Sequence, residues 1–225
     1  MEKTDWNKLI DSLSRQGILR SPKVINAMRM VPRTKFLSPD SRSYDSVDTP
    51  LPIGFGQTIS APHMVSIMNE ALQLEAGQKV LEVGAGSGWH AATIAEIIAP
   101  KGAPRSEWGH VYTVEIVQGL AETSRKNIMN AGYGDRISII MGDGSKGCIE
   151  KAPFDRMLVT AAAPDVPKPL VDQLKPGGIL LIPVGAVNMF QTLWKLMKGS
   201  DGKLEEENLG GVAFVPLTGK YGHKF

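Results

Sequence analysis

Cysteine is almost absent from this chain: Cys148 is the single one among 225 residues. One thiol cannot form an intramolecular disulfide, and chains without disulfides are typical of a reducing compartment. The same count excludes a zinc–cysteine cluster, and the four histidines lack the spacing of metal ligands. We therefore predict no metal site, and we interpret Cys148 as a small buried side chain and not a nucleophile.

An excess of charge of either sign is also lacking, because 25 basic and 23 acidic residues leave a net charge of +2. That balance offers no electrostatic attraction for nucleic acid or an anionic membrane. The longest apolar run, residues 179–187, is interrupted by Pro183 and Gly185 and is too short to span a bilayer. The first residues lack the basic segment and apolar run of a signal peptide. We expect a cytoplasmic protein with neither nucleic acid nor membrane as partner.

Helical and extended patterns alternate along most of the chain. Helical spacing of apolar residues predicts helices over 5–16, 22–30, 63–74, 89–98, 118–131 and 169–174. Short apolar runs predict strands over 79–83, 109–115, 137–141, 154–160 and 179–183. Residues 41–62 are too rich in proline and glycine for a helix and predict an ordered loop or a short hairpin. Residues 100–110 predict a surface insertion, and 191–198 with 204–216 predict an antiparallel pair around the turn 199–202.

The most informative stretch is residues 80–89, in which a strand pattern runs directly into Gly84, Gly86 and Gly88 and then into a helix. Glycines at such a turn permit positive φ and let a ligand lie against the backbone at a helix N-terminus. The dinucleotide fingerprint G-x-G-x-x-G would need glycine at position 89, where this chain has Trp89. A nicotinamide or flavin cofactor is therefore disfavoured.

Two carboxylates follow the next two predicted strands. Glu115 ends one strand, where it is placed to accept hydrogen bonds from two ribose hydroxyls. Asp143 follows the other, within reach of an adenine amino group. Each carboxylate taken singly could simply be solvated or cap a helix. Because the carboxyl ends of parallel strands meet at one edge of a sheet, the turn and both acids together predict a nucleoside pocket.

Other site chemistries are not supported by the motifs. Gly202-Lys203 and Gly219-Lys220 are each followed by a residue other than Ser or Thr, so a phosphate-binding P-loop is absent. The segment 143–147 resembles a nucleophile elbow only in part, since Asp143 stands where the first glycine is required.

A family resemblance emerges from these residues. Residues 80–89 resemble motif I of class I S-adenosylmethionine-dependent methyltransferases. Residues 52–64, Pro-Ile-Gly-Phe-Gly-Gln-Thr-Ile-Ser-Ala-Pro-His-Met, resemble the far more specific signature of protein-L-isoaspartate (D-aspartate) O-methyltransferases. The match continues at 159–164, 174–178, 183–185 and 214–217, in the order of the family. The blocks cover residues 50–217, and the N-terminal helices are similar too.

The resemblance implies a protein repair enzyme. Such enzymes transfer a methyl group from S-adenosyl-L-methionine to the free α-carboxylate of L-isoaspartyl residues in damaged proteins and peptides. The methyl ester collapses to a succinimide that hydrolyses partly to aspartate, and S-adenosyl-L-homocysteine is the other product. A carboxylate nucleophile is ionised at pH 7 without a base, so alignment matters more than acid–base groups.

The resemblance also implies the site residues. Ser60 is the catalytic residue, expected to orient the substrate carboxylate, although it could instead cap the helix that starts at Pro62. His63 is either a substrate contact or a packing residue. The implied substrate-binding residues are Gln57, Ser60 and His63. The implied cofactor-binding residues are Thr58, Ile59, Gly84, Gly86, Ser87, Gly88, Glu115, Ile116, Asp143, Gly144 and Thr218.

The expected fold class is α/β: a Rossmann-like, doubly wound, mainly parallel sheet with an antiparallel C-terminal hairpin and an N-terminal helical cap. We expect one methyltransferase domain over 1–225, with the helical cap and substrate loop at 1–76, the cofactor-binding core at 77–200 and the last strand and tail at 201–225. A monomer is expected. Acceptance of D-aspartyl residues, flanking-residue preference and the roles of 100–110 and 219–225 stay open.

Two other functions remain as alternatives. One is a methyltransferase of the same fold that acts on another carboxylate or on nucleic acid, although the near-neutral charge disfavours nucleic acid. The other is a non-catalytic cofactor-binding module, since a fold alone does not establish an activity.

Overall fold

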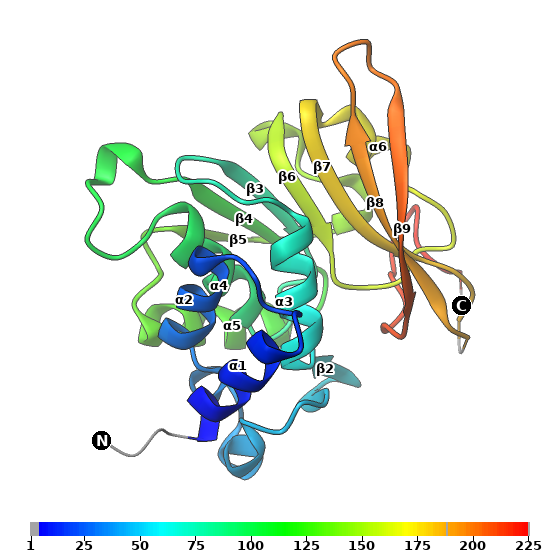
Figure 1. Ribbon diagram of the computed structural model, residues 1–225. Helices are drawn as coiled ribbons and strands as arrows, with labels where there is room; N and C mark the ends of the chain where they lie inside the picture. The colour runs from blue at the N-terminus through cyan, green and yellow to red at the C-terminus, as the bar shows by residue number, and fades with distance from the viewer. Residues whose placement is uncertain (1–4, 188, 225) are drawn as a thin grey trace.

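A seven-stranded sheet forms the centre of the molecule in the computed structural model, which describes residues 5–187 and 189–224 (Figure 1). Its strand order is β5-β4-β3-β6-β7-β8-β9. The expected domain runs from residue 1 to residue 225, and its ends, residues 1–4 and 225, lie outside the described residues. The strands are β3 (Lys79–Val83), β4 (His110–Glu115), β5 (Ile137–Met141), β6 (Phe154–Val159), β7 (Leu174–Val184), β8 (Gln191–Lys198) and β9 (Leu204–Val212).

The order of the strands places a topological switch point at β3 and β6. The chain runs from β3 outward through β4 to β5 and then returns to place β6 on the other side of β3, all parallel. In open α/β sheets, ligands bind beyond the carboxyl ends of the strands at such a point. β8 and β9 are antiparallel, which confirms the predicted C-terminal hairpin.

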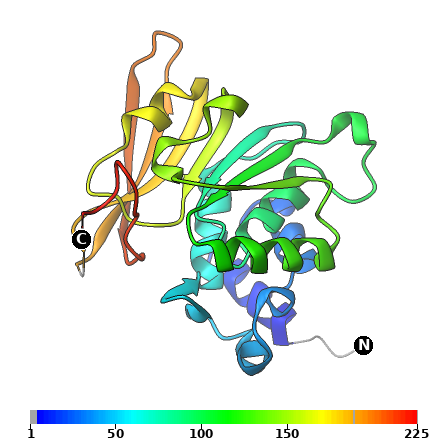
Figure 2. The ribbon, with the colours of Figure 1, turned by 180° about the vertical axis from the view of Figure 1, so that it is seen from behind.

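Helices cover one face of the sheet and shorter segments cover the other (Figures 1 and 2). The helices are α1 (Asp5–Arg15), α2 (Pro22–Met30), α3 (Pro62–Ala71), α4 (Trp89–Ile98), α5 (Gln118–Ala131) and α6 (Lys168–Asp172). Residues of α1–α5 share a hydrophobic cluster with alternate residues of the strands. The opposite face packs against α6 and against the buried Cys148, whose thiol pKa is raised by burial.

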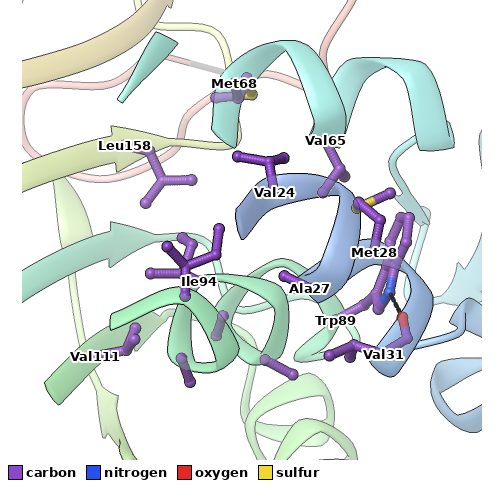
Figure 3. Close-up of a cluster of buried hydrophobic side chains, with 14 of the residues drawn as sticks. Val24, Ala27, Met28, Val31, Val65, Met68, Trp89, Ile94, Val111 and Leu158 are labelled. Atoms are coloured by element: carbon purple, nitrogen blue, oxygen red, sulfur yellow. Dashed lines mark hydrogen bonds between the residues drawn. The ribbon is translucent and has the colours of Figure 1, made fainter. Parts of the chain in front are cut away.

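Trp89 anchors the N-terminal helices to the core. Its indole Nε1 donates a hydrogen bond of 2.9 Å to the carbonyl of Val31, and its ring lies 5.9 Å from that of Trp6 (Figure 3). Met28 of α2 and Val65 of α3 lie beside it in Figure 3. The N-terminal cap is thus built into the same core as the sheet.

A small hairpin precedes α3. It consists of β1 (Leu51–Gly54) and β2 (Gln57–Ile59), and it confirms the hairpin expected within 41–62. The same stretch also contains part of a 3-10 helix, η2 (Pro39–Tyr44), which the sequence did not predict. A second 3-10 helix, η1 (Arg33–Phe36), lies just before it.

Strand β7 is longer than expected, since it starts at Leu174 and not at 179. Pro176, Gly177 and Gly178 hid this extension because those residues are poor strand formers. The segment 100–109 is mostly exposed, as predicted for an insertion, and β4 still ends at Glu115. Among the described residues, no helix has the length and apolar content needed to cross a bilayer.

Candidate functional site

The glycine turn lies at the carboxyl end of β3, and its glycines do different things. Gly84 has φ of +97°, and a Cβ there would lie 2.4 Å from Thr160 Oγ1, so only glycine fits against the end of β6. Gly88 is buried, and a Cβ there would lie 2.9 Å from Ile128 Cδ1 of α5. Gly84 therefore borders the open edge of the sheet, whereas Gly88 allows α4 to approach α5.

Glu115 is held by backbone amides. Its Oε2 accepts a hydrogen bond of 2.9 Å from Gly86 N, and its Oε1 accepts from Ile116 N at 2.9 Å and Val117 N at 3.0 Å. The residue is only 6% exposed. A carboxylate has about four acceptor positions, so these three bonds leave Oε2 able to accept from a ligand hydroxyl. The turn after β3 and the start of α5 thus fix one carboxylate at the expected edge.

An open cavity, here called the strand-end cavity, lies beside these groups and has a volume of about 730 Å³ including its mouth. Its walls are largely apolar, with Val117, Leu120 and Leu217 among them. The structure brings many of the predicted site residues to it: Gln57, Thr58, Gly84, Gly86, Glu115, Ile116, Gly144 and Thr218. Gln57 was predicted on the substrate side and lies here instead.

Asp143 is not among the residues that line this cavity, and its carboxylate is bonded to the C-terminal segment instead. Its Oδ1 accepts from Ser145 N at 3.0 Å and Ser145 Oγ at 2.6 Å, and its Oδ2 accepts from Lys220 N at 2.9 Å. Burial raises the pKa of Asp143, but these hydrogen bonds and the Lys146 ammonium outweigh burial and hold that pKa below its ordinary value. Gly144, the next residue, does line the cavity.

A second cavity, here called the hairpin cavity, adjoins the first. It lies between the β1–β2 hairpin, the start of α3 and residues 211–215, and it contains Ser60 and His63. Thr58, Thr160 and Val215 line both cavities. Ser60 is therefore at the side of the strand-end cavity and not inside it.

Ser60 does not cap α3. The residue at the N-cap position is Ala61, whose own side chain makes no capping hydrogen bond. Ser60 Oγ has no hydrogen-bond partner within 5–187 and 189–224, and the residue is half-buried. Its hydroxyl is consequently free to donate into the cavity.

His63 is held by an aspartate that sequence reasoning missed. Asp48 Oδ1 accepts from His63 N at 2.9 Å and lies 2.9 Å from His63 Nδ1. An ionised carboxylate only accepts, so Nδ1 carries the proton and Nε2 is left for the cavity. The only hint in the sequence was the position of Asp48 just before the signature block.

Ile59 and Ser87 lie around a smaller cavity behind the turn, with Ser60 and Gly86 also at its wall. Ile59 is buried in the hydrophobic core. Ser87 Oγ accepts a hydrogen bond of 3.3 Å from Trp89 N, and its carbonyl accepts from Asn127 Nδ2 at 3.0 Å. Ser87 therefore takes part in the bonds that hold the turn, whereas Ile59 is a core residue at the edge of the small cavity.

A buried carboxylate lines the same small cavity. Glu82 is 0% exposed, and Thr113 Oγ1 donates to its Oε2 at 2.5 Å. Its Oε1 has no hydrogen-bond partner in the part of the chain that the structure describes. Burial raises the pKa of Glu82 to about 8. Nearby, burial lowers the pKa of His90 to about 3. An acid inside the apolar run of β3 was the signal that could have found Glu82.

Thr160 is a third residue that the sequence did not single out as part of the site, after Asp48 and Glu82. Its Oγ1 donates to Gly84 O at 2.8 Å and lies 3.0 Å from Val83 O, which ties the end of β6 to the glycine turn. It lines the strand-end cavity, the hairpin cavity and the small cavity alike. Its position in the block 159–164 is where the three spaces meet.

Comparisons with known proteins agree on one family. The family model described as Protein-L-isoaspartate(D-aspartate) O-methyltransferase (PCMT) matches residues 4–222. A protein-L-isoaspartate O-methyltransferase of Hyperthermus butylicus is 54% identical over 96% of this chain and 89% of its own length. The protein of that name from Thermococcus onnurineus is 50% identical over 100% of this chain and 99% of its own length.

A solved structure is similar over almost the whole fold. It comes from Plasmodium falciparum, and its description names a protein-L-isoaspartate O-methyltransferase in complex with S-adenosyl-L-homocysteine. The TM-score is 0.83 at 28% identity, and the match covers 96% of this chain and 99% of that one.

Proposed function

This chain belongs to the protein-L-isoaspartate(D-aspartate) O-methyltransferase family, and we propose that the two adjoining cavities divide its reaction between a methyl donor and a damaged protein. The enzyme is an S-adenosyl-L-methionine-dependent carboxyl methyltransferase of protein repair. It methylates the free α-carboxylate of L-isoaspartyl residues, and S-adenosyl-L-homocysteine is the product.

The single observation that carries the division is the junction of the cavities. The strand-end cavity offers a fixed carboxylate, glycine backbone and apolar walls, which fit a ribose and an adenine ring. The hairpin cavity offers a free hydroxyl and an imidazole, which fit a carboxylate. Thr58 and Thr160 stand where the two spaces meet. A methyl group held at that junction would face a carboxylate held beside Ser60.

We place the cofactor on Glu115, Ile116, Gly84, Gly86, Gly144, Thr58 and Thr218, all of which line the strand-end cavity. Ile59, Ser87 and Gly88 support the turn behind it. Asp143 stays a proposed cofactor residue, and its role there would require its carboxylate to share the bonds it makes to Ser145 and Lys220. Gln57 lies on the cofactor side, so a substrate contact from it would reach across the mouth.

The reaction needs alignment more than proton transfer. A free α-carboxyl group has a pKa of roughly 3.5, so the substrate is already ionised at pH 7 and requires no general base. S-Adenosyl-L-methionine supplies a methyl group activated by the positive sulfonium. Holding two reactants in line can contribute about 7–11 kcal/mol to lowering the barrier. We propose that Ser60 Oγ donates to one carboxylate oxygen and so aims the other at the methyl carbon.

The covalent changes balance without a further reactant. The carboxylate oxygen forms a bond to the methyl carbon as the carbon–sulfur bond breaks, and that electron pair stays on sulfur as a neutral thioether. In the released ester, the following backbone nitrogen attacks the carbonyl and methanol leaves, which closes a succinimide. Water then opens that ring to aspartate or to isoaspartate. Only the first step needs the protein.

Finer properties extend this proposal. The small net charge supports a protein that acts without nucleic acid or membrane partners. We also propose that it is a cytoplasmic monomer. We propose that 1–76 carries the cap and substrate loop, 77–200 the cofactor-binding core, and 201–225 the last strand and tail.

One assay tests the function. The protein is incubated with radiolabelled S-adenosyl-L-methionine and with paired peptides that differ only in Asp or isoAsp at one position. Methyl transfer to the isoAsp peptide alone is the expected result. Cofactor binding without transfer to either peptide would favour a non-catalytic module, and transfer to a different carboxylate would favour the other methyltransferase.

A further inference from the structure

Arg33 is the most completely bonded buried charge near the site. The residue is 0% exposed, and each of its five N–H groups has a backbone carbonyl as partner. Nε donates to Asp45 O at 3.2 Å, and Nη2 donates to Tyr44 O at 2.9 Å and Val47 O at 2.7 Å. These hydrogen bonds from a buried side chain hold the backbone of the segment 44–49 in place.

The remaining nitrogen of Arg33 connects that segment to the backbone of Ser60. Nη1 donates to Thr49 O at 2.7 Å and makes a long contact of 3.5 Å with Ser60 O. Its guanidinium carbon lies 5.9 Å from the centre of the Trp89 ring, at the start of α4. One side chain therefore joins the segment 44–49 to the backbone of Ser60 and to the start of α4.

The positive charge of Arg33 is balanced by two carboxylates to which it makes no direct hydrogen bond, those of Asp45 and Asp48. Burial lowers its pKa to about 10, which leaves the guanidinium protonated at pH 7. The carboxylates of Asp45 and Asp48 oppose that shift electrostatically. Asp45 is itself bonded to Thr34 Oγ1. Asp48 is the acid that holds His63.

We propose that Arg33 and Asp48 are positioning residues for the isoaspartyl substrate. Arg33 holds the segment 44–49 in place, Asp48 on that segment orients the His63 ring, and His63 Nε2 then stands at the wall of the hairpin cavity. This role rests on the proposed function. We expect Arg33 and Asp48 to affect binding of the peptide and not binding of the cofactor. The reason is that Arg33, Asp48 and His63 do not line the strand-end cavity.

Asp48 does two things at once, which makes the assignment testable. Its Oδ1 accepts from the backbone N–H of His63 in the first turn of α3, and it also contacts the ring. A carboxylate at that place stabilises the helix terminus whatever the ring does. Only the second contact depends on the presence of an imidazole.

Arg136 offers a matched control. It is 4% exposed, donates to the carbonyls of Ala99 and Gly132 at 2.9 and 2.8 Å, and packs on the Trp108 ring at 4.9 Å. It lines neither cavity. Lysine keeps the charge at either site but loses the planar fork of donors, so Arg33→Lys and Arg136→Lys each break hydrogen bonds of a buried guanidinium, which for Arg136 also lies 3.8 Å from Glu96 Oε2.

The first experiment measures peptide and cofactor separately in these two variants. Arg33→Lys is expected to raise KM for an isoAsp peptide at least tenfold, with Kd for S-adenosyl-L-homocysteine within twofold of wild type. Arg136→Lys is expected to change neither by more than twofold, although both variants lose thermal stability. An equal rise of KM and Kd in Arg33→Lys, or an unchanged KM, would overturn the role of Arg33.

The second experiment is a double-mutant cycle between Asp48 and His63, which can be carried out even if the Arg33 variant folds poorly. Asp48→Ala is expected to raise KM for the peptide about tenfold in the wild-type background, yet less than twofold in a His63→Ala background. The loss of helix capping is the same in both backgrounds, so a purely structural role would give equal effects. Equal effects would overturn the role of Asp48.

The wild-type protein in the same assay separates the two proposals. No methyl transfer by wild type would overturn the proposed function and this role with it. Transfer by wild type, with Asp48→Ala behaving like Arg136→Lys, would overturn the positioning role alone.

Discussion

The two cavities of the site are built by different means. The core of the strand-end cavity is backbone at strand ends together with Glu115, which three amides hold, although Thr58 and Thr218 line it too. The hairpin cavity takes its polar groups from the side chains of Ser60 and His63, and the His63 ring is held by Asp48 from an earlier segment of the chain. Recognition by backbone depends on glycine and strand geometry, whereas recognition by side chains depends on tertiary packing. Substitutions on the cofactor side should therefore weaken binding by changing the shape of the cavity. Substitutions on the substrate side should act by removing a single functional group.

The largest expected effect breaks the backbone-built side. Gly84→Val places a β-branched side chain at φ of +97°, with its Cβ 2.4 Å from Thr160 Oγ1. Positive φ alone costs about 1–2 kcal/mol for such a residue, and the overlap displaces the turn. We expect Kd for S-adenosyl-L-homocysteine, measured by calorimetry, to rise more than 100-fold.

The control for that variant is Gly202→Val. Gly202 has φ of +82° in the turn between β8 and β9, with no atom within 4 Å of a Cβ built there. It carries the same backbone strain without the overlap, so it should lose stability and keep its affinity. Similar losses of affinity in both variants would mean that strain, and not the shape of the turn, controls binding.

A smaller effect is expected from breaking the side-chain-built side. Ser60→Ala removes the hydroxyl proposed to donate to an ionised carboxylate, a bond worth about 1.5–3 kcal/mol. This corresponds to a fall of about 10- to 100-fold in kcat/KM for an isoAsp peptide, with cofactor affinity within twofold. Steady-state kinetics and calorimetry on one preparation measure both.

Ser66→Ala is the matched control, on the helix α3 that follows Ser60. Ser66 Oγ is buried and donates to Pro62 O at 2.8 Å, inside α3 and away from both cavities. It should lower stability slightly and leave turnover intact. If Ser60→Ala reduced cofactor affinity as much as turnover, Ser60 would belong to the cofactor side.

The smallest effect on binding and turnover is expected at the one side chain that departs from the comparison, the buried Glu82 behind the backbone-built turn, where the change should appear in stability instead. Its pKa is raised by burial from 4.5 in the unfolded reference to about 8. The stability from its protonated form is fully present below pH 4.5 and is lost as pH rises through 8. We expect the wild-type free energy of unfolding to fall relative to Glu82→Gln between pH 5 and 8.5, on the order of a few kcal/mol.

Urea unfolding at several pH values measures that difference, without cofactor present. Glu107→Gln, at an exposed position on the insertion, is the control and should track wild type at every pH. Parallel pH profiles for wild type and Glu82→Gln would show that Glu82 is ionised in the folded protein.

Much of the backbone-built side could be predicted from the sequence. The strand 79–83, the helices 89–98 and 118–131 and the strand 137–141 were predicted with the bounds observed, because their apolar patterns are local. The positions of Gly84 and Glu115 at one sheet edge followed from parallel pairing. The different duties of Gly84 and Gly88 did not follow, because Thr160 and Ile128 approach them from other segments.

The side-chain-built side was predicted only in part. The signature around Ser60 indicated a substrate loop, but nothing local indicated that Ala61 and not Ser60 would occupy the N-cap of α3.

Asp143, on the cofactor side, was interpreted as an adenine contact, and its bond to Lys220 N joins residues 77 positions apart. A carboxylate after a strand has several geometrically equal partners, and sequence spacing does not rank them.

The sequence by itself determined the order of helices and strands, the glycine turn, the acid at the end of β4 and the family. These depend on periodicity and on residue types at short range. Only the tertiary structure decided that Thr160 stands between the two cavities, that Asp48 holds His63, and that Arg33 secures the segment carrying Asp48. The physical reason is that a buried side chain bonds to whichever carbonyls the packed core brings within about 3 Å, and those carbonyls belong to segments distant in the chain.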